Sequence, residues 1–599
     1  MIIGPVFSRE LAIAPRRIQT YAARAAYALI LLGLISIAWT MLTGTQIVRN
    51  LGDMARFGAI LFQILAPLQL AMAMFFSATL VAGAVGQEKD RKTLILLLLT
   101  HLSNSELVLG KLFASLLGVF MLLVAGLPVF MITAMLGGVS FDQIGRSTAV
   151  TAATILACGS LGSTLALWRE KTFQSLAMTV LLLVLWLAVW EIVAAGALGS
   201  SFGGLACDAW AAMFSPWQAI VEATRPFPEI YPGLGVFGSP VILFVIVALA
   251  VSAILNGTAI ALVRVWNPSR EVHVGVAEES AGHEETKWNL EDSSKKVQLE
   301  AAAATTARRS TRAVWDNPIL WRETRTWAYG RRILLIRVVY LALFALAAGS
   351  LWWMVGHETL TKTSASAVLA PFFFLSLILL NAQAVTALTS ERDAKALDLL
   401  LVTDLTPKEI VFGKLGGVVY NTKEMFLLPI VLCVYLWLAG MLSLENTFYL
   451  VTGLTILNAF GAVLGVHAGI TYANSLGATA TSLGTVFFLF LGVATCMRMM
   501  VAFSGSFEAQ LAPFLAITVL GGAGLYLALG IRNPSPAIGL ASFLCPFATF
   551  YAITSFLLGY TLPVFLVTGS AYGFMIAAML IPAIYEFDVA TGRTTLAEQ

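Results

Sequence analysis

The chain has 599 residues, of which 59% are hydrophobic and only 12% are charged, and its mean hydropathy is +0.86. Soluble globular proteins average about 25% charged residues, so this composition excludes water as the main solvent of the chain. The formal net charge of +3 is too small to indicate a nucleic-acid partner. A membrane protein with the lipid bilayer as its solvent is therefore expected.

Apolar runs of about 18 residues or more recur from end to end of the chain. A helix of that length crosses the roughly 30 Å hydrocarbon core of a bilayer, where the backbone must satisfy its own hydrogen bonds. We therefore expect an all-α polytopic membrane protein, because the ~10-residue alternation of a transmembrane barrel is absent. The first half is predicted to cross six times, at about 25–42, 58–86, 112–136, 148–168, 174–198 and 239–263.

The second half is less regular. Residues 267–313 turn to Glu, Lys, Ser and Ala and predict a polar, flexible cytoplasmic linker. Further spans are predicted at about 333–356, 366–389, 415–441, 447–471, 480–502, 511–531, 535–558 and 562–584. Residues 511–531 have no counterpart in the first half, whereas 544–554 resembles 214–224. The second half therefore crosses eight times, or 511–531 and the region of Cys545 enter the bilayer without crossing it.

The first 24 residues carry arginines but extend too far ahead of an apolar run that lacks a small-residue cleavage site. An uncleaved cytoplasmic N-terminus is expected. The cysteines show neither a CxxC pair nor metal-ligand spacing, so free buried thiols and no metal site are expected. They are Cys158, Cys207, Cys433, Cys496 and Cys545.

The chain contains an internal repeat. Residues 88–112 read EKDRKTLILLLLTHLSNSELVLGKL and residues 391–415 read ERDAKALDLLLVTDLTPKEIVFGKL, with 14 of 25 positions identical. The segments ahead of the first span of each half agree as well. Pro5, Arg9, Glu10, Arg16, Arg17, Arg24 and Tyr27 recur as Pro318, Arg322, Glu323, Arg331, Arg332, Arg337 and Tyr340.

This repeat predicts two units, 1–266 and 314–599. Six crossings in the first unit bring both copies into the membrane from the same side, so we expect parallel repeats related by a pseudo-twofold axis along the membrane normal. Placing both charged segments in the cytoplasm puts most Lys and Arg residues on that side, as the positive-inside rule requires. Both termini are then cytoplasmic.

The repeated segment combines charges with a leucine-rich stretch, which predicts a short amphipathic helix at the interface over 88–99. Ser103 with Glu106, and Thr406 with Glu409, match the capping box that begins a helix. Each copy is thus expected to form an elbow of span, short helix, tight turn and capped span.

The pattern ExDxKxLxLLLxTxL, followed by E and then GK, resembles the coupling-helix region of ABC exporter permeases of the second superfamily. These permeases have six helices per half and an interfacial elbow helix, which PxxxRE followed by RR resembles at 1–24 and 317–332. The resemblance is best over 1–112 and 314–415. Family members often carry Gly-Thr where this chain has Lys92-Thr93 and Lys395-Ala396, which is a departure from the pattern.

The resemblance implies that coupling segments 88–103 and 391–406 dock two copies of a cytoplasmic ABC ATPase, in a permease of the inner cell membrane. The implied docking residues are Glu88, Asp90, Arg91, Lys92, Thr100, Leu102, Ser103, Glu391, Asp393, Lys395, Thr403, Leu405 and Thr406. The chain carries no GxxxxGK[ST] motif. We therefore expect no enzyme activity and no cofactor in this chain, with ATP and Mg bound by the partner. The alternative is that these residues are ordinary solvated loop charges.

Ionisable residues within spans are functional candidates. Aligning 174–176 with 481–483 sets Glu191 against Arg498 near the outer ends of equivalent spans, which predicts a gate ion pair. Alternatively, each side chain extends to nearby headgroups. Lys423 and Glu424 are candidate pathway residues, or else they pair with neighbouring helices or mark an irregularity in their own helix.

Other classes remain as alternatives. An ion-coupled secondary transporter also uses repeats, but is expected to show mid-membrane acidic or histidine residues. A transport-inactive scaffold related to ABC permeases would use the same elbows to anchor a partner. No HExxH or other hydrolase motif is present, and nothing in the spans selects a cargo.

Overall fold

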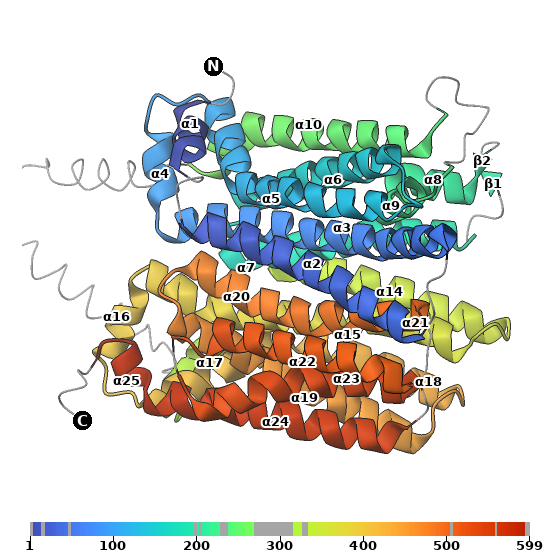
Figure 1. Ribbon diagram of the computed structural model, residues 1–599. Coiled ribbons are helices and arrows are strands. Elements are labelled where there is room, and N and C mark those ends of the chain that lie inside the picture. Colours follow the sequence, from blue (N-terminus) through green and yellow to red (C-terminus); the bar gives the residue numbers. More distant parts are fainter. Residues whose placement is uncertain are drawn as a thin grey trace, which may run out of the picture.

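The computed structural model describes residues 4–13, 18–45, 50–196, 201–202, 205–227, 238–268, 315–325, 333–503, 507–532, 534–557 and 560–593. Within these residues the chain is a bundle of long helices, with one short hairpin of β1 (Ser201–Phe202) and β2 (Leu205–Ala206) (Figure 1). The predicted linker, apart from Asn267 and Pro268, lies outside the described residues, as do parts of both N-terminal elbows.

The first half confirms the six predicted crossings with six long apolar helices. They are α2 (Ile18–Thr45), α3 (Leu51–Asp90), α5 (Asn104–Met135), α6 (Phe141–Trp168), α7 (Thr172–Ala194) and α10 (Pro240–Trp266). Four short helices accompany them: α1 (Gly4–Ile13), α4 (Thr93–Leu98), α8 (Cys207–Phe214) and α9 (Pro216–Ala223).

The second half follows the same order at first and then adds helices. Its first elements are α13 (Pro318–Arg325), α14 (Ile333–Gly356), α15 (Lys362–Asp393), α16 (Ala396–Leu401), α17 (Pro407–Asn421), α18 (Lys423–Leu438) and α19 (Leu444–Thr471). Next come α20 (Ser475–Phe487), a π-helical segment η3 (Phe488–Gly492) and α21 (Val493–Ala502). The last are α22 (Phe507–Leu529), α23 (Pro536–Leu557), α24 (Thr561–Tyr585) and α25 (Phe587–Ala590).

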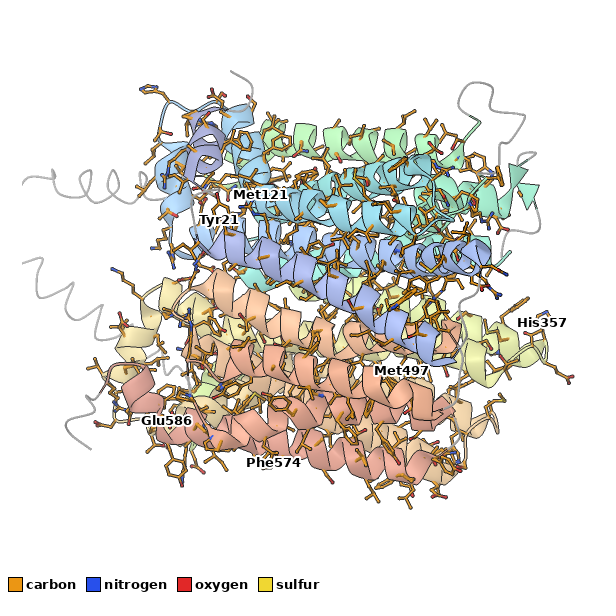
Figure 2. All side chains as sticks on the ribbon, in the orientation of Figure 1. Tyr21, Met121, His357, Met497, Phe574 and Glu586 are labelled. Atoms are coloured by element: carbon orange, nitrogen blue, oxygen red, sulfur yellow. The ribbon has the colours of Figure 1, made fainter. Side chains whose placement is uncertain are left out.

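Twelve helices in the described part of the chain are long and apolar enough to cross a membrane, and α17 with α18 form a further candidate bent by 57°. The chain is thus an all-α multi-pass membrane protein. Helix α23 runs unbroken through Cys545 and is long and apolar enough to be a candidate span. Polar side chains such as Glu586 and His357 lie toward opposite ends of the bundle (Figure 2).

Apolar contacts join the two halves. Helix α7 packs against α14 and α15, and α3 packs against α20 and α21. The rings of Phe75 and Phe487 stack across this interface with centroids 4.6 Å apart. Four of the five cysteines, Cys158, Cys207, Cys433 and Cys545, are free and buried, as predicted.

Each half contains one very close helix crossing at matching positions. A Cβ added at Gly162 on α6 would lie 2.9 Å from the Ala78 carbonyl oxygen on α3. In the second half, a Cβ added at Gly465 on α19 would lie 2.8 Å from the Asn381 carbonyl oxygen on α15. Membrane helices approach this closely only where a small residue leaves room for the facing backbone.

We expect Gly465→Ala to destabilise the protein by about 1 to 3 kcal/mol, because the new methyl group would force two backbones apart. Gly453→Ala on the same helix is the control, since a Cβ there meets nothing within 4 Å. Thermal unfolding of the purified variants in detergent measures both. Equal unfolding midpoints for the two variants would contradict the close crossing.

Candidate functional site

The two copies of the repeated segment lie at the same end of the bundle, where Figure 1 shows α4 and α16 together with α1 and α25. We call this the elbow end. Each copy follows a long helix, α3 or α15, and precedes the next long helix, α5 or α17.

The charged residues of each copy belong to the end of the long helix and not to the short one. Helix α3 continues through Asp90, and Lys92 then takes a left-handed conformation with φ of +59° before α4 begins. The prediction of one helix over 88–99 is therefore wrong, because a left-handed residue ends the α-helical hydrogen-bond pattern. Lys395 does the same ahead of α16, with φ of +56°.

A lysine thus occupies the left-handed position in both copies. A left-handed conformation costs an L-residue with a Cβ roughly 1 to 2 kcal/mol, whereas glycine adopts it freely. Lys92 and Lys395 both take the left-handed conformation despite this cost. The sharp turn between the long and the short helix therefore forms without glycine.

We expect Lys395→Gly to be more stable than Lys395→Ala by about 1 kcal/mol. Both variants remove the charge, so the comparison isolates the backbone conformation. Thermal unfolding midpoints in detergent provide the measurement. If alanine proved as stable as glycine, position 395 could not hold a left-handed conformation.

Both predicted capping boxes are confirmed. The Ser103 backbone N–H donates to Glu106 Oε2 at 3.0 Å, and the Glu106 N–H donates back to Ser103 Oγ at 3.3 Å. Thr406 and Glu409 exchange the same two bonds at 2.8 and 3.3 Å. Each box fixes the point at which the chain re-enters the bundle.

An arginine from elsewhere in each half also holds the elbow turn, which the sequence did not indicate. The Arg264 guanidinium donates to the carbonyl oxygens of Leu98 and Leu102 at 3.2 and 3.3 Å. In the second half, Arg593 donates to the carbonyl oxygens of Thr403 and Leu405 at 2.8 and 3.0 Å.

A buried charge network anchors the second elbow. Lys414 Nζ lies 2.7 Å from Oε1 of both Glu323 and Glu391, and Arg322 pairs with the same two carboxylates. The Lys414 and Glu323 side chains are only 1% and 4% exposed. Two cations thus balance two anions, and the network joins α13, α15 and α17. The sequence carries a signal for this network, because Glu10 matches Glu323 and Lys111 matches Lys414 in the repeat.

The electrostatics of Glu323 follow from this network. Burial alone would raise the pKa of Glu323, but Lys414 and Arg322 together hold it below its ordinary value. A carboxyl group with a lowered pKa in the folded state stabilises the fold at neutral pH, and that contribution is lost as the pH falls through the lowered pKa.

We expect Lys414→Met to destabilise the protein by about 3 kcal/mol or more, because two carboxylates would then share one partly exposed guanidinium. Lys111→Met is the matched variant in the first half and should cost less, since Lys111 and its partner Glu88 are 22% and 24% exposed. Adding Glu323→Gln to Lys414→Met should restore part of the loss. Thermal unfolding measures all three, and an equal loss at positions 111 and 414 would argue against the network.

Polar contacts tie the two copies to each other across the interface between the halves. Arg91 Nη2 lies 3.0 Å from Asp393 Oδ1, and Gln87 donates to Asn474 Oδ1 at 3.0 Å. Within the first half, Asp90 accepts a hydrogen bond from Thr172 at 2.6 Å, which joins α3 to α7. The ion pair between Arg91 and Asp393 has no equivalent with the two copies exchanged, because Ala394 occupies the position that matches Arg91.

The structure divides the predicted docking residues into two groups. Glu88, Asp90, Arg91, Glu391 and Asp393 make the internal contacts described above. The exposed group consists of Lys92, Thr100, Ser103, Lys395, Thr403 and Thr406, with Leu102 and Leu405 half-buried.

Each short helix, with the residue that follows it, also exposes apolar side chains that were not among the predicted docking residues. Leu96 and Leu99 are 64% and 63% exposed, and at the matching positions Leu399 and Val402 are 75% and 86% exposed. Leu94 and Leu397 on the opposite faces are buried. We call Leu96 with Leu99, and Leu399 with Val402, the two apolar knobs. The leucine run could have indicated these knobs, because it is too long for all of its side chains to lie on the buried face of one short helix.

The predicted gate pair is not formed in this conformation. Glu191 accepts two hydrogen bonds from Gln218, at 3.0 and 3.1 Å, and among the described residues no ion pair involves Arg498. A pair that forms in another conformation stays a prediction.

The two candidate pathway residues make local contacts at a helix break. Lys423 lies over the ring of Tyr420, and Glu424 pairs with Arg337 at 3.4 Å. They stand where α17 meets α18, so the predicted irregularity of this helix is present. Their role in a pathway stays a prediction.

No protein-family model matches the chain, and no curated protein is significantly similar to it.

Proposed function

We propose that this chain is the membrane-spanning permease subunit of an ATP-driven exporter, in which separate ATPase subunits hydrolyse ATP. The observation that carries the proposal is the pair of apolar knobs, which repeat at matching positions on two elbows at one end of the bundle. Isolated apolar side chains are common on protein surfaces, but matched pairs beside polar residues are typical of a protein contact site.

The knobs fit two copies of one partner. Each has two apolar side chains three positions apart on a short helix, so each can fill one pocket with a single helix face. Lys92, Thr100, Lys395 and Thr403 form a polar rim around them. The partner proposed is a cytoplasmic ABC ATPase, which binds ATP and Mg.

A rigid elbow is needed if movement of the partner is to reach the membrane helices. A capping box and an arginine contact hold each elbow to the long helices beside it, and in the second elbow the Lys414 network adds to them. A push on a knob would therefore move whole helices and not a loop. This is the requirement of a rigid-body transition between two packings.

The arrangement proposed for the two units is parallel, with a pseudo-twofold axis along the membrane normal. Three observations support it: six long helices in the first half, both elbows at one end, and paired interfaces in which α3 meets α20 while α15 meets α7. The elbow end is then cytoplasmic, in the inner cell membrane. One chain would supply a complete translocation unit.

We expect Leu399→Asp to abolish or strongly reduce retention of the ATPase, because a charge would enter an apolar pocket of the partner. His101→Asp is the matched control: the second copy already has Asp404 at that position, so the change should be tolerated. The measurement is Mg-ATP hydrolysis by the complex purified from its native membrane and placed in liposomes.

The same preparation separates the alternatives. An ion-coupled transporter would move its cargo with no ATPase bound, and a scaffold would retain its partner without transport. If Leu399→Asp left both retention and hydrolysis intact, the knobs would not be the docking site.

A further inference from the structure

At the end of the bundle opposite the elbows, a cavity of about 510 Å³ lies between the two halves. Its walls come from α3 and α9 of the first half and from η3 and α21 of the second. A volume of this size falls within the range of about 300 to 1,000 Å³ that ligand sites occupy. This cavity is open to its surroundings, and its walls leave room for a small molecule where the halves meet.

Most of the cavity wall is apolar, and one cation on it is not neutralised. Trp217, Leu68 and Leu491 are among the apolar lining residues. Two guanidinium groups line the cavity, but Arg225 is paired with Glu222 at 2.9 Å. Arg498 has no ion pair among the described residues. The Arg498 side chain is exposed, so its guanidinium is accessible to an anionic ligand in the cavity.

The π-helical segment places Arg498 on this wall. Each residue added to a helical turn rotates everything beyond it by about 100°, and η3 lies just ahead of α21. The corresponding helix α7 is α-helical throughout, and its Glu191 lines a different cavity, of about 410 Å³. Arg498 of the second half therefore lines the cavity between the halves, whereas Glu191 of the first half does not.

A second irregularity supplies an acceptor to the same wall. Pro67 lies inside α3 and has no N–H, so the carbonyl of Gln63 lacks its usual helical donor, although the helix continues through this point. Both residues line the cavity.

We propose that this cavity binds an amphiphile with an acidic headgroup, a phosphate or a carboxylate, whose anion pairs with Arg498 while its chain lies against the apolar wall. A guanidinium binds either anion through two parallel hydrogen bonds. The inference rests on the proposed function in one respect: it names the class of cargo that an exporter of this kind would carry.

Binding of dodecyl phosphate to the purified chain in phosphatidylcholine nanodiscs tests the site, with no ATP or ATPase present. We expect saturable binding, weakened at least about tenfold by Arg498→Gln and restored in part by Arg498→Lys. Arg56→Gln is the control, because Arg56 is an exposed arginine of α3 that does not line the cavity. A second variant, Ala494→Trp, should abolish binding by filling the cavity without changing its charge.

Three further ligands identify the recognised chemistry. Dodecyl carboxylate should compete, dodecyl maltoside should not, and inorganic phosphate should compete only weakly. Competition by inorganic phosphate as strong as that by dodecyl phosphate would overturn the amphiphile in favour of a free anion. Unchanged affinity in both Arg498→Gln and Ala494→Trp would overturn the site. Leu399→Asp should bind dodecyl phosphate normally, so that failure of ATPase docking and failure of this site give different results.

Discussion

The elbow end depends on a lysine ammonium that is almost without access to solvent and is shared by two carboxylates. Lys414, Glu323 and Glu391 come from three helices, so their contact fixes all three at one point. The attraction between buried charges offsets their loss of hydration only when the charged groups stay in close contact. These helices therefore have little freedom to slide past one another. The short helix α16 follows directly from α15, and its position is set by the same contact.

The first copy reaches the same shape with a weaker anchor. Lys111 and Glu88 form the corresponding pair, but both side chains are partly exposed, and solvent lowers the strength of such a pair. The capping box and the arginine contact are present in both copies. Local sequence thus determines the shape of each elbow, whereas the strength of its attachment depends on burial.

Much of the fold followed from local signals: apolar run length predicted the long helices, and the serine and threonine caps predicted where two of them begin. The charge network could not be predicted, because Glu323 and Lys414 are 91 positions apart in the sequence. The repeated charges also resemble those of an ordinary solvent-exposed loop. The turn at Lys395 was missed because the usual glycine is absent. The gate pair relied on an alignment of Glu191 with Arg498, whereas the matching contacts of Asp90 with Thr172 and of Asp393 with Ser475 set Glu191 against Ala494.

The ion pair between Arg91 and Asp393 has no twin, since Ala394 occupies the position that would complete it. An ion pair present on one side only cannot obey exact twofold symmetry, so the two halves meet there as unlike surfaces. In an assembly of two identical chains related by a twofold axis, every such contact occurs twice. Because both halves lie in one chain, the two copies can differ in sequence at such a position.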